Sequence, residues 1–90
     1  MYKTNPSILK ESTSEDEVIM YDQENKNTII LNFTAKMLYE NLIDNDYDMG
    51  ISQYLSKAEE VFNVNREELE NDAKSTFQYL LNNNILVEVS

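Results

Sequence analysis

The sequence contains no cysteine and no histidine. Without cysteine there is neither a disulfide framework nor a thiolate ligand, and without histidine the chain lacks the commonest general base and metal ligand. The serines have no histidine to activate them, and the single glycine, Gly50, leaves no glycine-rich loop to hold a phosphate. We therefore expect a protein that is not an enzyme and that uses no cofactor and no metal.

Long apolar runs are missing as well. No stretch reaches ten consecutive apolar residues, and the N-terminus does not combine a basic segment with an apolar one. Such a chain offers neither a membrane span nor a secretory signal. We expect a cytoplasmic protein that does not engage a membrane.

Basic residues are scarce relative to acidic ones. Seven Lys and Arg stand against seventeen Asp and Glu, which gives a formal net charge of −10. This charge repels a phosphate backbone and favours a cationic or neutral partner, so we expect no nucleic acid. The 41% hydrophobic and 27% charged residues are typical of a globular protein, and we expect one domain over residues 1–90.

The first third of the chain has the pattern of three antiparallel strands. Short apolar or β-branched runs alternate with polar clusters that are typical of turns. The runs are residues 8–10, 18–21 and 28–31. Because residues 28–31 come last in this meander, we expect them to form an edge strand.

From Ala35 onward the apolar spacing is helical. The spacing predicts a first helix capped by Thr34 or Asn32, a second helix capped by Asp48, and a third, longer helix. The third helix begins with a capping box of Asn65 and Glu68 and ends at residues 82–84. The tail, residues 85–89, is expected either to return as a strand or to cover the core. Three consecutive strands followed by three helices predict an α+β fold.

Three alternating acids between the first two predicted helices suggest a calcium loop. Asp44, Asp46 and Asp48 have the spacing of the first three EF-hand ligands. The sixth position of the loop, which needs glycine, is Met49, and the twelfth, which needs glutamate, is Leu55. The acids are therefore interpreted as a solvated turn.

A groove is predicted between residues 28–31 and the third helix. A partly polar stripe flanks the apolar face of that helix, and an unpaired strand edge beside it can accept an extended peptide as a further strand. The alternative is that Tyr79 is only a half-buried surface aromatic. The stripe consists of Asp72, Ser75, Thr76 and Tyr79.

The residues Leu31-Asn32-Phe33-Thr34 resemble the Leu-Asn-x-Thr-Gly turn of the PqqD family, whose members are RiPP recognition elements. The likeness covers about residues 6–87. The further matches, in order, are Leu38-Tyr39 with an Ile-Trp pair, Ile51 and Leu55 with Ile-x-x-x-Leu, Phe62-Asn63-Val64 with Tyr-x-Val, Asp72-Ala73 with Asp-Val, and Phe77, Leu80 and Asn84-Ile85-Leu86 with Phe-Leu, Leu and Gly-Leu-Leu.

The chain departs from the family pattern at three turns. Ala35 stands where the family has glycine, Asn45 stands in its Asp-Gly turn, and Asn84 replaces a late glycine. Asparagine is among the residues that best tolerate a positive φ. Asn45 and Asn84 are therefore tolerable replacements for glycine in these turns, whereas Ala35 is consistent with tighter helix packing.

The resemblance implies a winged-helix-like module that binds the leader of a ribosomally synthesised precursor peptide by strand addition. A free-standing member would deliver the leader to a separate maturation enzyme: a radical-SAM protein, a cyclase or a leader peptidase. The implied contacts on the strand are Thr28, Ile29, Ile30 and Leu31. The contacts on the facing helix, which rest on periodicity, are Asp72, Ser75, Thr76 and Tyr79.

Two other functions are compatible with this fold class. One is an acidic structural or regulatory subunit that binds a folded protein partner. The other is a DNA-binding winged helix, but a recognition helix needs basic residues that face the DNA groove. The third predicted helix offers only Arg66 and Lys74 among four acidic residues.

Overall fold

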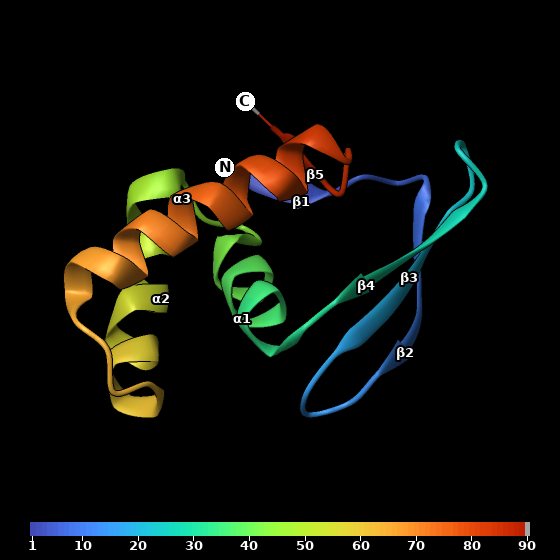
Figure 1. The fold of residues 1–90 in the computed structure, drawn as a ribbon. Helices are drawn as coiled ribbons and strands as arrows, with labels where there is room; N and C mark the ends of the chain where they lie inside the picture. The colour runs from blue at the N-terminus through green and yellow to red at the C-terminus, as the bar shows by residue number, and fades with distance from the viewer. Residues whose placement is uncertain (90) are drawn as a thin grey trace.

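The computed structural model describes residues 1–89 as strands, helices and short connections. The predicted α+β class, with three antiparallel strands followed by three helices, is confirmed (Figure 1). No helix among the described residues is long and apolar enough to cross a membrane. The elements are β1 (Tyr2–Thr4), β2 (Ile8–Thr13), β3 (Val18–Asp22), β4 (Asn27–Leu31), α1 (Phe33–Leu42), α2 (Tyr47–Val61), α3 (Arg66–Asn82) and β5 (Leu86–Glu88).

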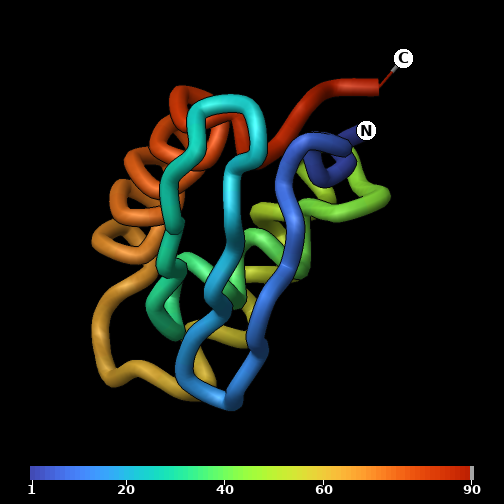
Figure 2. The backbone as a smooth tube through the Cα atoms, turned by 90° about the vertical axis from the view of Figure 1, so that its right-hand side faces the viewer, coloured from blue at the N-terminus to red at the C-terminus, as the bar shows by residue number. Residues whose placement is uncertain are grey.

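The three-stranded sheet has the order β2-β3-β4, so β4 is an edge strand as expected. Alternate residues of β4 point to opposite faces of the sheet. Ile29 and Leu31 are buried, whereas Ile30 is 58% exposed. The helices cover the buried face, and the opposite face is free of other elements in Figure 2.

Strand β2 is longer than the predicted run of residues 8–10. The register against β3 shifts between Lys10 and Ser12, so that a β-bulge accommodates one extra residue. The polar end of β2 thereby continues to pair with β3 up to Thr13.

A second, two-stranded sheet joins β1 and β5, with Tyr2 opposite Glu88. Of the two alternatives for the tail, the strand is the correct one. Strand β1 was not predicted, because three residues are too few to establish an alternating pattern. Tyr2 belongs to the core, and its ring meets that of Phe77 edge to face at 5.4 Å between centroids.

Each of the three helices begins with a side chain that accepts a backbone hydrogen bond. Asn32 accepts from the Ala35 N–H at 2.9 Å and Asn65 accepts from the Glu68 N–H at 2.8 Å, which confirms Asn65 and selects Asn32 over Thr34. The prediction of Asp48 as the second cap is wrong. Asp46 caps α2 instead and accepts from Met49 at 2.7 Å, because the helix begins at Tyr47 and places Asp48 inside its first turn. In the first turn the negative charge of Asp48 interacts favourably with the positive end of the helix dipole.

A positive φ is found at Asn84, where asparagine replaces the family's glycine, but not at Asn45. The left-handed residue in that turn is Asp44, with φ 63°. Asn45 instead donates its side-chain amide to the Asn41 carbonyl at 2.8 Å and accepts from the Tyr2 backbone N–H at 3.0 Å. These bonds hold Asn45 to the end of α1 and to β1, so the reversal of the chain occurs one residue earlier.

Helices α1 and α2 approach each other closely at Gly50. A Cβ atom at this position would lie 2.6 Å from Leu42 Cδ2 and 3.0 Å from the carbonyl oxygen of Asn41. Both of those residues are buried. The one glycine of the chain is thus required by the packing of the two helices.

Asp22 organises the turn that leads into β4. Its carboxylate accepts from the side-chain amide of Asn25 at 2.8 Å and from the backbone N–H groups of Asn25 and Glu24 at 3.1 and 3.0 Å. The side-chain hydrogen bond from Asn25, followed by those backbone bonds, lowers the pKa of Asp22 below its ordinary value. The ionised form is therefore the one that the turn stabilises.

Replacement of Asp22 by asparagine is expected to reduce the pH dependence of stability. Because the folded-state pKa is lowered, the contribution of Asp22 is complete above the unfolded value of about 3.9 and is lost as the pH falls through the folded value. Urea denaturation at pH values from 7 to 2 should show Asp22→Asn losing less stability than the wild type at the acidic end. Asp16→Asn, an exposed acid in the preceding turn, is the control. An identical pH dependence in wild type and Asp22→Asn would contradict the prediction.

Candidate functional site

A groove of about 570 Å³ lies between the edge strand β4, the start of α1 and the facing side of α3. We call it the β4–α3 groove. Its volume lies within the range of about 300–1,000 Å³ that is common for ligand sites. The lining residues are Ile30, Leu31, Asn32, Thr34, Ala35, Asp72, Ser75, Thr76 and Tyr79.

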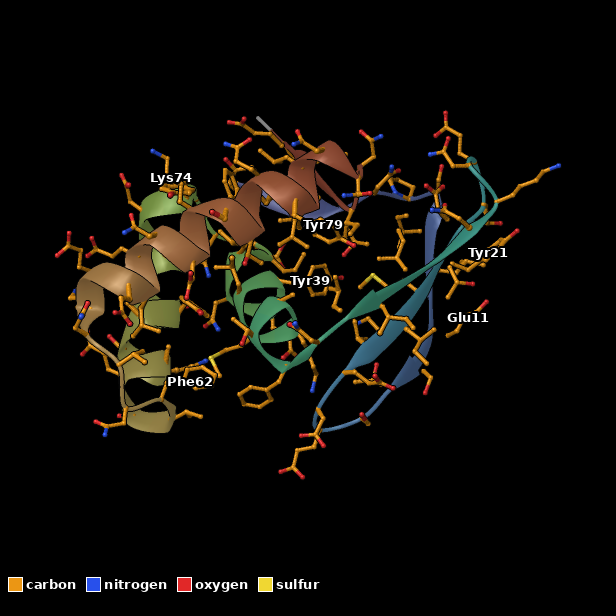
Figure 3. The ribbon with its side chains drawn as sticks, viewed as in Figure 1. Glu11, Tyr21, Tyr39, Phe62, Lys74 and Tyr79 are labelled. Carbon is orange, nitrogen blue, oxygen red and sulfur yellow. The ribbon has the colours of Figure 1, made fainter. Side chains whose placement is uncertain are left out.

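The helical wall of the groove is one stripe of α3. Asp72, Thr76 and Tyr79 follow one another at intervals of three or four residues, so they lie on the same side of the helix. Tyr79 is 44% exposed, and Figure 3 shows it on the side of α3 that faces the sheet. The neighbouring stripe, which includes Ala73 and Phe77, is buried in the core.

The opposite wall is an open strand edge. β4 pairs with β3 along one side, with Ile30 opposite Ile19, and within residues 1–89 it pairs with no other strand. An antiparallel strand directs its N–H and C=O groups alternately to the two sides. One set of the backbone groups of β4 is thus available at the groove.

The groove brings together six of the eight residues that the sequence predicted for the site. Ile29 and Thr28 are the other two. Ile29 is only 5% exposed and faces the core, because it alternates with Ile30 along the strand, while Thr28 is exposed but does not line the groove. The backbone of Thr28 points away from β3 and can take part in a strand-edge interaction, whereas the N–H and C=O groups of Ile29 point to β3. The contact of Thr28 stays a prediction, as do the contacts of the other six.

Three lining residues were not predicted: Asn32, Thr34 and Ala35. All three lie at the N-terminal end of α1, which follows β4 directly. That connection was visible in the sequence, since a groove beside the last residues of β4 has to include whatever comes next in the chain. The sequence did not reveal that α3 lies against the same end of α1.

Asp72 is the one charged residue that lines the β4–α3 groove. The positive charges of α3 lie elsewhere: Arg66 is paired with Glu59 and also lies 3.5 Å from Glu70, and Lys74 points outward on the far side of the helix in Figure 3. The groove therefore suits a neutral or cationic ligand and is unfavourable to a phosphate backbone.

The alternating acids of the suspected calcium loop lie apart from the groove. Asp46 is engaged as the cap of α2, and Asp44 lies 3.6 Å from the Lys3 ammonium group. Among the residues that the structure describes, no three acidic side chains gather as a metal site would require.

Comparison with known proteins yields similarity in structure only. No family model and no curated protein matches the sequence. The structure of TbiB1 in complex with the TbiA(beta) leader peptide superposes with a TM-score of 0.76 at 15% identity, covering 98% of each chain. The structure of lasso peptide synthetase B1 complexed with the leader peptide has a TM-score of 0.78 at 18% identity, covering 97% of this chain and 98% of the other. The chain therefore has the fold of these two leader-bound B1 proteins.

Proposed function

We propose that the protein is a recognition element of the PqqD type, which binds the leader segment of a ribosomally synthesised precursor peptide in the β4–α3 groove. The observation that carries the proposal is the open edge of β4 opposite the partly polar stripe of α3. Both structural neighbours are complexes with a leader peptide, which supports this choice.

In the proposed binding mode the leader adds to the sheet as a strand next to β4. Its backbone pairs with the free N–H and C=O groups of β4, and its alternate side chains enter the groove between Ile30 and Tyr79. The half-exposed ring of Tyr79 supplies a large contact area at a small cost in conformational entropy. The net charge of −10 would favour a leader that carries lysine or arginine.

The role is recognition rather than bond chemistry. A leader held by this protein stays close to a separate maturation enzyme, so that the second encounter becomes nearly intramolecular. The enzyme would be a radical-SAM protein, a cyclase or a leader peptidase, acting in the cytoplasm where the precursor is made.

Binding by strand addition predicts an alternating response to methylation of the leader backbone. The test is fluorescence polarisation with the leader of a short precursor peptide encoded beside this protein, each residue in turn carrying an N-methyl group. Every second N–H should point to β4, so alternate positions should lose about tenfold or more in affinity and intervening ones little. A scrambled leader is the control. A loss spread over consecutive positions would contradict strand addition, and saturable binding of neither leader would contradict the proposed function.

A further inference from the structure

A second, smaller hollow of about 150 Å³ adjoins the β4–α3 groove. The two share Thr34 and Asp72, so the hollow opens off the groove where β4 passes into α1. We call it the Tyr54 pocket. Its lining residues are Thr34, Tyr54, Phe62, Val64, Leu69 and Asp72.

Tyr54 is the unusual member of this set. The residue is 0% exposed, and within residues 1–89 its hydroxyl group has no hydrogen-bond partner. A buried hydroxyl without a partner costs free energy that a phenylalanine of the same shape would not. Buried polar groups that stay unpaired are rare in native proteins, so this one calls for a partner that enters the pocket.

The hydroxyl of Tyr54 is a neutral hydrogen-bond donor at physiological pH. Burial, and secondly the negative charge of Asp72, raise the pKa of Tyr54 above its ordinary value. Tyr54 and Asp72 both line the pocket. The proton on Tyr54 needs an acceptor, and the carboxylate of Asp72 can accept from a donor.

The size and the walls of the pocket limit what can enter. Phe62, Val64 and Leu69 make the walls apolar, and an apolar cavity of about 150 Å³ holds a group the size of benzene. A single group must then accept from Tyr54 and donate to Asp72. A hydroxyl does both, whereas an ammonium group only donates and a carboxylate only accepts and is repelled by Asp72. A carboxamide also does both, but its additional donor and acceptor sites would stay unpaired against the apolar walls.

We propose that the Tyr54 pocket is a specificity subsite that takes a hydroxyl-bearing side chain, of the threonine or tyrosine kind, from the bound peptide. The residue that enters lies in the segment just past the one paired with β4, beyond Leu31, because that is where the pocket meets the groove. The subsite rests on the proposed function, since it extends the same groove and adds side-chain selection to backbone pairing.

The first test compares Tyr54→Phe with the wild type. The variant loses only the unpaired hydroxyl, so it should melt at the same temperature or higher and should bind the fluorescent leader about tenfold more weakly. Tyr21→Phe is the matched control, because Tyr21 lies half-buried on the outer face of the sheet, away from the groove (Figure 3). Equal binding of the leader by wild type and Tyr54→Phe would overturn the subsite and leave the proposed function standing.

The second test makes the change on the peptide. Each threonine or tyrosine of the leader is replaced by valine or phenylalanine, one at a time. One of these replacements should weaken binding to the wild type and have no further effect on Tyr54→Phe, as expected for two groups in contact. If no hydroxyl of the leader is coupled to Tyr54 in this way, the subsite is wrong.

A third test does not depend on the leader. The protein is titrated with phenol, toluene and n-butylammonium, which carry a hydroxyl group, no polar group and an ammonium group. Binding is followed by the NMR signals of the methyl groups of Val64 and Leu69. Phenol should bind the wild type more tightly than Tyr54→Phe, and toluene should bind both alike. Tighter binding of butylammonium, or no effect of the variant on phenol because water alone satisfies the hydroxyl, would overturn the proposal. Selective phenol binding by a protein that binds no leader would reject the proposed function and keep the chemistry of the pocket.

Discussion

Replacement of Ile30 by proline is expected to abolish leader binding while the protein stays folded. Proline removes the backbone donor at position 30 and its ring crowds the approach of an added strand, and edge strands are where a sheet tolerates proline. The loss of one backbone hydrogen bond, with its partner on the leader left unpaired, should by itself cost about tenfold in affinity, and the steric effect of the ring should add to this. Fluorescence polarisation measures the affinity, and a thermal melt followed by circular dichroism shows whether the sheet survives.

Two matched variants separate the backbone from the side chain and from the sheet. Ile30→Ala keeps the N–H and removes the exposed side chain, so it should weaken binding less than proline does. Lys10→Pro makes the same change in β2, the opposite edge of the same sheet, because the N–H of the exposed Lys10 also points away from β3. If folded Ile30→Pro binds the leader as the wild type does, or if folded Lys10→Pro is equally damaging, the interaction does not occur at the edge of β4.

Replacement of Gly50 by valine should have the largest effect on stability. The new Cβ would meet Leu42 Cδ2 at 2.6 Å and the Asn41 carbonyl oxygen at 3.0 Å, and neither the packed methyl group nor the backbone can move away freely. Overpacking of this kind costs about 3 kcal/mol, which lowers the melting temperature of a domain of this size by roughly 12–24 °C.

The control for Gly50→Val lies on the exposed face of the same helix. Ser52→Val introduces the same side chain into α2 without a neighbour to meet, so it reports only the small cost of valine in a helix. Gly50→Ala should fall between the two, because alanine favours the helix over glycine but its Cβ makes the same close contacts. A melting temperature of Gly50→Val within a few degrees of that of Ser52→Val would show that α1 and α2 are not so closely packed.

Local patterns were sufficient to predict most elements of the fold. The apolar and β-branched run of residues 28–31 lies within β4, and Asn65 is recognisable as a cap because its side chain acts on a backbone group only three residues away. The choice among Asp44, Asp46 and Asp48 failed for the opposite reason. All three can cap a helix, and only the tertiary position of α2 decides which one does.

The parts of the candidate site that follow the period of a helix could be predicted from the sequence. The stripe from Asp72 to Tyr79 follows from helical spacing, and the same reasoning applied to the strand would have placed Ile29 in the core. The Tyr54 pocket could not be predicted from the sequence. Tyr54 fits the apolar stripe of α2, and whether its hydroxyl finds a partner depends on where α3 and Asp72 lie in space.

The ladder between β1 and β5 bears on the order in which the chain folds. It joins opposite ends of the described chain, so its formation carries the highest loop-closure entropy, whereas the β2-β3-β4 meander forms from neighbouring segments. The ladder should therefore close late, when Tyr2 reaches Phe77. None of the residues that line the β4–α3 groove belongs to β1 or β5, so the groove can take shape before the ends of the chain meet.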